Sequence, residues 1–332
     1  MTKKIFALGL AAILALAPVQ AFAKTVSITN VSYDPTREMY EQYNQIFEKH
    51  WKEETGEDVE VTQSHGGSGK QALEVANGLD ADVVTLALEY DIESIEKAGL
   101  VHSGWQNNFA NDSSPYTSTI VFLVKKGNPL NIQDWDDLTK EGVGVVTPNP
   151  KTSGGARWNY MAAWAYADKK YDGDEDQIET FIQKLYQNVV VLDSGARGAT
   201  TSFVENSQGD VLIAWENEAY LSMRDYPDEY EIVTPSISIL AQPSVAVVDE
   251  VVDYRGTREV ATEYLNYLYS EEAQEIAAQN YFRPTDQKIL EKYSDVFDLN
   301  VDLVTIKDYG GWDAVQEKHF TDGGVFDRIY ER

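Results

Sequence analysis

The sequence contains no cysteine and only four histidines in 332 residues. Without cysteine the chain can form no disulfide, no thiolate metal site and no catalytic thiol, and it cannot carry the lipidated cysteine that anchors many exported bacterial proteins. The four histidines, His50, His65, His102 and His319, include no pair at helical ligand spacing. We therefore expect no metal, no cofactor and no cysteine-dependent catalysis.

Positive charge is also scarce, with 27 Lys and Arg against 55 Asp and Glu and a formal net charge of −28. Such a surface repels nucleic acid and anionic membranes, so neither is an expected partner. Surface carboxylates are screened over about 8–10 Å at physiological salt, whereas buried backbone dipoles act on a ligand at contact distance. The acid excess thus indicates solubility, and it leaves a small anion open as a ligand.

Long apolar runs are absent except at the N-terminus, over residues 5–18. This run follows two lysines and precedes an Ala-x-Ala site at 21–23, a pattern that predicts a secretory signal peptide over residues 1–23. The run is too short to span a bilayer, and no later stretch is longer. We expect a mature chain that begins near Lys24 and lies free in the periplasm as a monomer.

Strand-like and helix-like patterns alternate along the rest of the chain, which predicts an α/β fold with parallel sheets. The length suggests two lobes, and ligands of such sheets bind where the carboxyl ends of the strands meet. We expect a single helix over 260–280. The predicted segments are 24–115 for the first lobe, 116–215 for the second lobe, 216–286 for a return to the first lobe, and 287–332 for a C-terminal tail packed on the lobes.

Three glycine-rich turns each stand between a predicted strand and a predicted helix, at residues 65–69, 152–156 and 193–198. A helix N-terminus leaves backbone N–H groups unpaired and carries a partial positive charge, so a glycine-rich entry lets an oxyanion approach closely. One such turn would be an ordinary helix N-cap. Three in one chain indicate an anion site at their meeting point.

Two enzymatic interpretations of the first turn fail. The turn is not a nucleotide-binding P-loop, because Ser64 stands where the first glycine belongs and Gln71 follows Lys70. The residues Ser68, His65 and Asp34 could suggest a catalytic triad, but the nucleophile-elbow pattern is missing. The sequence therefore predicts a binding protein and not an enzyme.

Long motifs that include all three turns resemble the family of bacterial periplasmic sulfate-binding proteins, the sulfate and thiosulfate solute-binding proteins of ABC importers. The resemblance covers essentially the whole mature chain, to the tail Gly310-Gly311-Trp312. It implies a two-lobed, type II solute-binding fold that captures sulfate in the cleft and delivers it to an ATP-driven membrane permease. The motifs are residues 31–38, 63–71, 148–160, 192–198 and 213–218.

The resemblance also implies which groups bind sulfate. The implied donors are the backbone amides of Ser68, Gly154, Gly155 and Ala196, the hydroxyl of Ser153 and the indole N–H of Trp215. Asp34 would lie beside the site and organise the loops, and we expect backbone amides to occupy its carboxylate oxygens. His65, Arg157 and Arg197 would support the loops without pairing directly with the anion.

A pocket of donors alone suits sulfate, which is fully ionised and only accepts hydrogen bonds. Phosphate keeps a proton near neutrality, and that proton would find no acceptor; an unsatisfied buried group costs roughly 1–3 kcal/mol. Thiosulfate, molybdate and tungstate would use the same donors, so they remain open as ligands. A secreted ester hydrolase lacks a visible nucleophile or metal cluster, and ferric-ion capture by paired tyrosines would leave the three turns unexplained.

Overall fold

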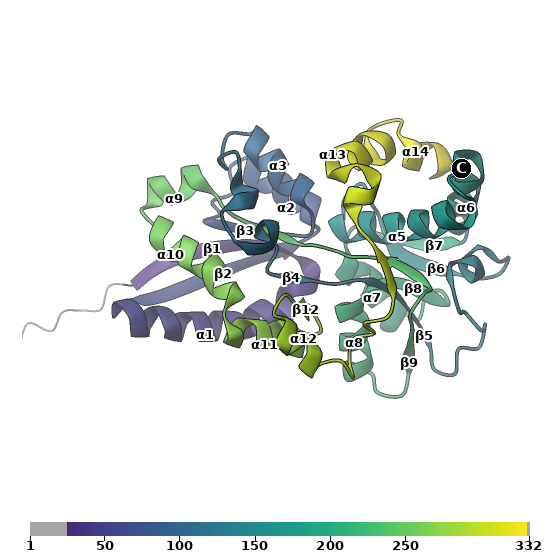
Figure 1. Ribbon diagram of the computed structural model, residues 1–332, viewed down its shortest axis with the longest axis horizontal. Helices are drawn as coiled ribbons and strands as arrows, with labels where there is room; N and C mark the ends of the chain where they lie inside the picture. The colour runs from purple at the N-terminus through teal and green to yellow at the C-terminus, as the bar shows by residue number, and fades with distance from the viewer. Residues whose placement is uncertain (1–24, 331–332) are drawn as a thin grey trace, which may run out of the picture.

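The structure, a computed structural model, describes residues 25–330 and consists of two lobes that lie side by side (Figure 1). Each lobe has a central sheet with helices on both faces. The predicted signal peptide lies outside the described residues. Within residues 25–330, no helix is long and apolar enough to cross a bilayer.

The first lobe is built on a four-stranded sheet with the order β11-β3-β1-β2. The strands β1 (Thr25–Tyr33), β2 (Asp58–Gly66) and β3 (Val83–Leu86) are parallel, and β11 (Ser244–Val247) is antiparallel to β3. Its helices are α1 (Arg37–Thr55), α2 (Ser68–Ala76), α3 (Glu89–Lys97), α9 (Asp249–Arg255), α10 (Arg258–Asn266) and α11 (Glu271–Gln279).

The prediction of a single helix over 260–280 is wrong, because the chain forms two helices there. A 3₁₀ turn at Tyr267–Tyr269 ends α10, and the side chain of Ser270 then caps α11 by accepting a hydrogen bond from the amide of Ala273 at 3.2 Å. The apolar pattern continues through this break, so periodicity alone did not reveal the new N-cap.

The second lobe is built on a five-stranded sheet with the order β7-β6-β8-β5-β9. Strands β6 (Val145–Pro148), β7 (Val189–Asp193) and β8 (Val211–Trp215) are parallel. Strand β5 (Ile120–Lys125) is antiparallel to both of its neighbours, β8 and β9 (Tyr230–Val233), so β9 runs in the same direction as β8. Its helices are α5 (Gly154–Lys170), α6 (Glu175–Gln187), α7 (Ala196–Val204) and α8 (Glu216–Asp225). The expectation of parallel sheets therefore fails at one strand of each sheet, β11 in the first and β5 in the second.

The expected return to the first lobe at residue 216 is also misplaced. Strand β9 pairs with β5 inside the second sheet, which keeps residues 216–233 in the second lobe. The chain reaches the first sheet only at β11. Sequence patterns identified the strand near 231 but not its partner, because pairing depends on residues about 110 positions away.

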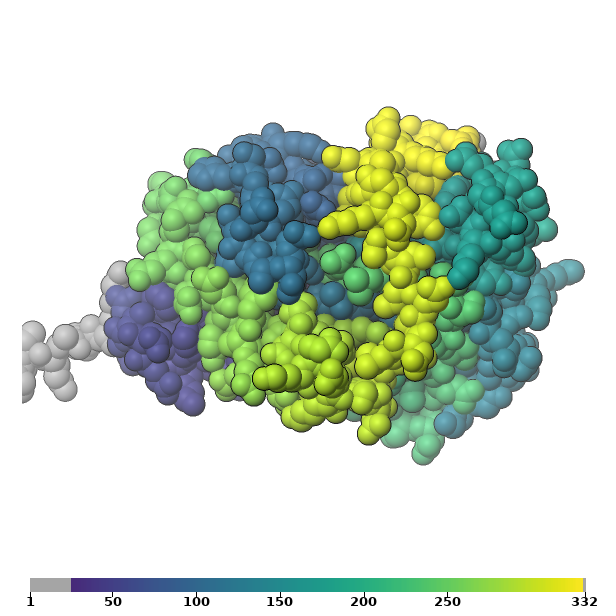
Figure 2. Space-filling model, viewed as in Figure 1, coloured from purple at the N-terminus to yellow at the C-terminus, as the bar shows by residue number. Residues whose placement is uncertain are grey.

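Short pairings join the segments that cross between the lobes. Strand β4 (Tyr116–Thr117) pairs with β12 (Arg283–Pro284), and β10 (Ile237–Ile239) pairs with β13 (Asp302–Val304). After β12 the chain forms α12 (Gln287–Lys292), α13 (Gly311–Val315), a π-helical turn (Gln316–Phe320) and α14 (Val325–Tyr330). Figure 2 shows this C-terminal segment crossing one face of the molecule.

Candidate functional site

The three glycine-rich turns meet at one small, tight cavity between the lobes. It is too small for a drug-sized ligand, whose pockets measure roughly 300–1,000 Å³, so nothing larger than a small ion can be held there. Larger hollows of ≈ 720 and ≈ 750 Å³ lie elsewhere and involve none of the three turns. The residues that line the small cavity are Tyr33, Asp34, Pro35, Gly66, Gly67, Ser68, Ser153, Gly155 and Ala196.

Backbone donors dominate this lining because three helices begin at the cavity. Helices α2, α5 and α7 start at Ser68, Gly154 and Ala196, and first-turn N–H groups have no acceptor within their own helix. The hydroxyl of Ser153 caps α5 by accepting from the amide of Ala156 at 3.3 Å. Its own hydrogen stays free for a ligand, so the hydroxyl can bridge helix and anion.

Glycine is required where the two lobes touch beside the cavity. A Cβ on Gly67 of the first lobe would lie 2.8 Å from the carbonyl oxygen of Thr152 in the second lobe. A Cβ on Gly154 would lie 2.9 Å from Cβ of Ser68, again across the cleft. Real Cβ atoms do not approach other atoms so closely, so only glycine fits at these two positions. The two lobes are therefore packed directly against each other beside the cavity, and we describe the structure as closed.

Asp34 lines the cavity, but its carboxylate does not have the partners we expected. Within residues 25–330 its recorded polar partner is Arg37, whose Nη2 lies 3.5 Å from Oδ1, and no backbone amide donates to either oxygen. The expectation of amide-occupied oxygens is therefore wrong. Oδ2 reaches the third turn, 2.5 Å from where a Cβ on Gly195 would be. Burial raises the pKa of Asp34, although Arg37, Arg197 and Lys70 oppose the shift.

Arg157 joins the two lobes through a buried ion pair with Asp91 of α3. The Nη1–Oδ1 distance is 3.2 Å, and the two side chains are only 8% and 4% exposed. Nε of Arg157 also donates to the carbonyl of Pro150 at 2.9 Å. The hydroxyl of Ser68 donates to the other oxygen of Asp91, so the amide of Ser68, and not its hydroxyl, is left for the cavity.

Arg197 makes a second contact between the lobes. Its Nη2 lies 2.8 Å from Glu38 of α1 and 3.1 Å from Glu218 of α8. Burial raises the pKa of Glu218, and the Arg197 guanidinium opposes this rise. The guanidinium groups of Arg157 and Arg197 are thus held by protein carboxylates, and their role as loop-supporting residues stays a prediction.

Trp215 lies behind the cavity and is only 1% exposed. Its indole N–H donates to the carbonyl of Gly155 at 3.2 Å, and its ring lies 5.4 Å from that of Tyr33. Of the predicted donors, Gly154 and Trp215 do not line the cavity and lie next to residues that do. An anion in the cavity would have to draw the indole donor away from the carbonyl of Gly155.

His65 stands at the end of β2, beside the first turn. Its Nδ1 lies 3.2 Å from the hydroxyl of Ser32. Burial, and next the positive charge of Arg37, lowers the pKa of His65 to about 4. The imidazole is therefore neutral at pH 7 and adds no positive charge to the site.

The second and third turns are bonded to each other within the second lobe. The amide of Asn149 donates to the carbonyl of Asp193 at 2.7 Å, and the Thr152 hydroxyl donates to the carbonyl of Ser194 at 2.8 Å. Two of the three helix N-termini are thus held together independently of the first lobe.

Sequence reasoning identified Asp34, Ser68, Ser153, Gly155 and Ala196, all of which line the cavity. It did not identify Asp91, Glu38 and Glu218 as the partners of the arginines. Glu38 and Glu218 end two of the quoted motifs, but the pairing of each acid appears only when its helix packs beside the arginine. It also missed Tyr33, Pro35, Gly66 and Gly67 as lining, although all four lie within the quoted motifs. Within the described residues, no group of three His, Asp or Glu could hold a metal ion.

Comparison with known proteins gives consistent results. The family described as bacterial extracellular solute-binding protein matches residues 28–283. A sulfate-binding protein of Escherichia coli is 57% identical, with 96% of this chain and 97% of that protein covered. A thiosulfate-binding protein of Pseudomonas aeruginosa is 49% identical, with 91% and 92% covered. Among solved structures, the sulfate-binding protein SubI from Mycobacterium tuberculosis has a TM-score of 0.80 and 34% identity, covering 89% of this chain and 100% of that one.

Proposed function

The chain belongs to the family of bacterial extracellular solute-binding proteins, and we propose that it binds sulfate between its lobes and delivers it to an ABC importer. One observation carries this proposal: three helix N-termini from the two lobes meet at one small cavity. Relatives at 56–57% identity are named sulfate-binding proteins, and none of these names describes an enzyme. The periplasm is the proposed location and a membrane permease is the proposed partner.

The proposed binding groups are all uncharged. The amides of Ser68, Gly154, Gly155 and Ala196 and the hydroxyl of Ser153 supply donors at contact distance, where backbone dipoles at helix N-termini favour an anion. The indole of Trp215 supplies one more donor once it leaves the carbonyl of Gly155. Because these groups come from both lobes, only the closed form can use all of them, and sulfate would shift the population toward it.

Selectivity against phosphate would follow from the shortage of acceptors. The exception is Asp34, whose carboxylate reaches the cavity with Arg37 as its partner. We propose that Asp34 holds the first turn against the third and that Asp34→Asn weakens sulfate binding. Tighter binding of sulfate or new binding of phosphate by this variant would instead show that the carboxylate acts mainly as a negative charge.

Thiosulfate is the second candidate ligand, since a relative with that name is 49% identical over most of the chain. Its extra sulfur atom is larger than oxygen and accepts hydrogen bonds more weakly. A cavity this small should therefore distinguish the two anions by fit, although both would use the same donors.

Calorimetric titration of the mature protein, freed of bound anion, tests the proposal directly. We expect sulfate to bind with a dissociation constant of about 1 μM or lower, which corresponds to roughly −8 kcal/mol, and phosphate to give no heat. Stronger binding of thiosulfate or molybdate would keep the anion site and change its ligand. Absence of binding by every oxyanion would overturn the function.

Closure is tested separately by small-angle scattering. Saturating sulfate should give a more compact profile than the anion-free protein, because the donors of both lobes must converge on one anion. Identical profiles would contradict ligand-induced closure.

A further inference from the structure

We propose that the C-terminal segment, residues 306–330, is a positioning element of the anion site, and that it acts through Lys151. This inference rests on the proposed function for its ligand, but its geometry stands independently. Lys151 immediately precedes Thr152 and Ser153 in the second glycine-rich turn, and its ammonium group points away from the cavity to the C-terminal segment.

Acceptors of the C-terminal segment surround this ammonium group. Nζ donates to the carbonyls of Phe320 at 3.1 Å and Thr321 at 3.2 Å, and it lies 2.9 Å from the carboxylate of Asp327. A lysine ammonium has three donors, and three acceptors satisfy them. The side chain of Lys151 is 26% exposed, and the hydrogen bond from it lowers the pKa of Asp327. These contacts differ from an ordinary exposed ion pair, which contributes little.

The backbone next to Lys151 leads directly to the proposed sulfate donors. Its amide donates to Oδ1 of Asn149 at 2.9 Å, and the amide of Ser153 donates to the carbonyl of Asn149 at 2.9 Å. These bonds close the turn that ends at Gly154, the first residue of α5. Holding Lys151 at one end of the turn therefore restricts where the amides of Gly154 and Gly155 can point.

The C-terminal segment is itself anchored on α5. Trp312 packs edge to face on Trp158 with ring centroids 4.7 Å apart, and the ring of Phe320 lies 5.0 Å from that of Tyr160. The turn that presents Thr321 is tight, because a Cβ on Gly324 would lie 2.9 Å from three backbone atoms. This packing explains why α5 is buried on nearly all sides, and it makes the segment a rigid support for Lys151.

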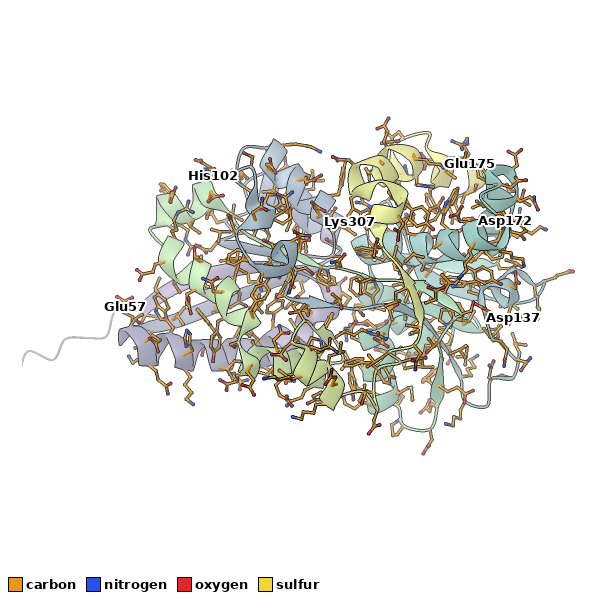
Figure 3. The ribbon with its side chains drawn as sticks, viewed as in Figure 1. Glu57, His102, Asp137, Asp172, Glu175 and Lys307 are labelled. Carbon is orange, nitrogen blue, oxygen red and sulfur yellow. The ribbon has the colours of Figure 1, made fainter. Side chains whose placement is uncertain are left out.

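The same segment also contacts the first lobe. Lys307 lies 3.2 Å from Asp112, and Asp313 lies 3.8 Å from Lys97 of α3, the helix that carries Asp91. Figure 3 labels Lys307 where the segment passes the border between the lobes. A segment that contacts both lobes and supports one anion turn is placed to influence both closure and the turn geometry.

The test compares Lys151→Met with Lys318→Met in the full mature chain. Lys318 belongs to the same segment and pairs with Glu175 of α6 at 2.6 Å, but this pair involves no glycine-rich turn. We expect Lys151→Met to lower sulfate affinity about tenfold, mainly through faster dissociation, and Lys318→Met to leave it unchanged. Lys151→Arg keeps the charge and several donors, so it should retain most of the affinity.

Hydrogen exchange of the anion-free protein gives a readout that does not depend on the ligand. In Lys151→Met, the hydrogen-bonded amides of Thr152, Ser153 and Ala156 should exchange faster than in the parent, while amides in the middle of α5 keep their protection. Asp327→Asn should produce the same effect more weakly, and combining it with Lys151→Met should add little.

Two results would overturn the proposal. One is unchanged exchange in the turn together with parental sulfate affinity in Lys151→Met. The other is an equal loss of sulfate affinity in Lys151→Met and Lys318→Met, which would show that the contacts of Lys151 only stabilise the fold and do not position the turn. If the parent protein binds no sulfate, the proposed function fails, and the exchange measurement still decides whether Lys151 positions the turn.

Discussion

The two lobes contribute to the anion cavity in different ways. The second lobe supplies two helix N-termini whose turns are bonded to each other, at 2.7 and 2.8 Å, and are supported by a helix buried on nearly all sides. The first lobe supplies one helix N-terminus, on the nine-residue helix α2, where Leu73 is 61% exposed. This difference indicates that the second lobe carries an assembled half-site and that the first lobe completes it by closing.

A substitution that prevents closure should have the largest effect. Gly67→Ala places a Cβ 2.8 Å from the backbone of Thr152, so the lobes must stay farther apart. We expect sulfate affinity to fall by more than 100-fold, since overpacking alone costs roughly 1–3 kcal/mol and the displacement of every donor of the first lobe adds to this cost. Calorimetry measures the loss. Gly69→Ala is the matched control, because its Cβ would meet no atom closer than 3.5 Å.

Removing a donor of the second lobe should have a smaller effect. Trp215→Phe retains the buried ring but loses the indole N–H, and we expect affinity to fall by about 1–3 kcal/mol, the range for a hydrogen bond to a charged group. Near-ultraviolet circular dichroism would confirm that the fold persists. Parental affinity would show that the indole keeps its bond to Gly155 and serves only the core.

Loosening the bonded turns of the second lobe should have a smaller effect still. Thr152→Val removes the hydroxyl that donates to the carbonyl of Ser194 at 2.8 Å. A net contribution of about 0.5–1.5 kcal/mol is typical of such a bond. If the second lobe is assembled in advance, this loss should appear in sulfate affinity without changing the scattering profile of the anion-free protein. A changed profile would mean that the bond holds the lobes themselves.

The smallest expected effect concerns the free energy of unfolding. It compares His65, at the end of β2 in the first lobe, with His319, in the C-terminal segment that packs on the second lobe. Burial lowers the pKa of His65 to about 4 and that of His319 to about 3. Both folded-state pKa values lie below 6.5, so the unfolded chain binds more protons between these pH values. Stability from each imidazole is present above pH 6.5 and is lost as pH falls.

Denaturant unfolding between pH 7 and pH 3 checks this. His65→Gln and His319→Gln should each make the decline in stability shallower than in the parent protein. His319→Gln should do so further down the pH range, because its folded-state pKa is lower. A decline as steep as that of the parent would show that the carboxylates account for all of it.

The sequence alone determined the α/β class, the three helix N-termini and most of the cavity lining. These features are local: a glycine-rich turn between a strand and a helix produces unpaired amides wherever it occurs, and Ser153 caps α5 from its own position in the chain. The resemblance to a known family then indicated which of these amides would face an anion.

The tertiary structure decided what depends on distant residues meeting. It placed β9 in the second sheet, paired Arg157 with Asp91 and Arg197 with Glu38, and gave Lys151 its acceptors in the C-terminal segment. No short pattern marks these partners, since each is an ordinary acid or carbonyl in its own element. Their roles come from packing two lobes and a returning chain into contact, where burial makes an unpaired charge costly and selects its partner.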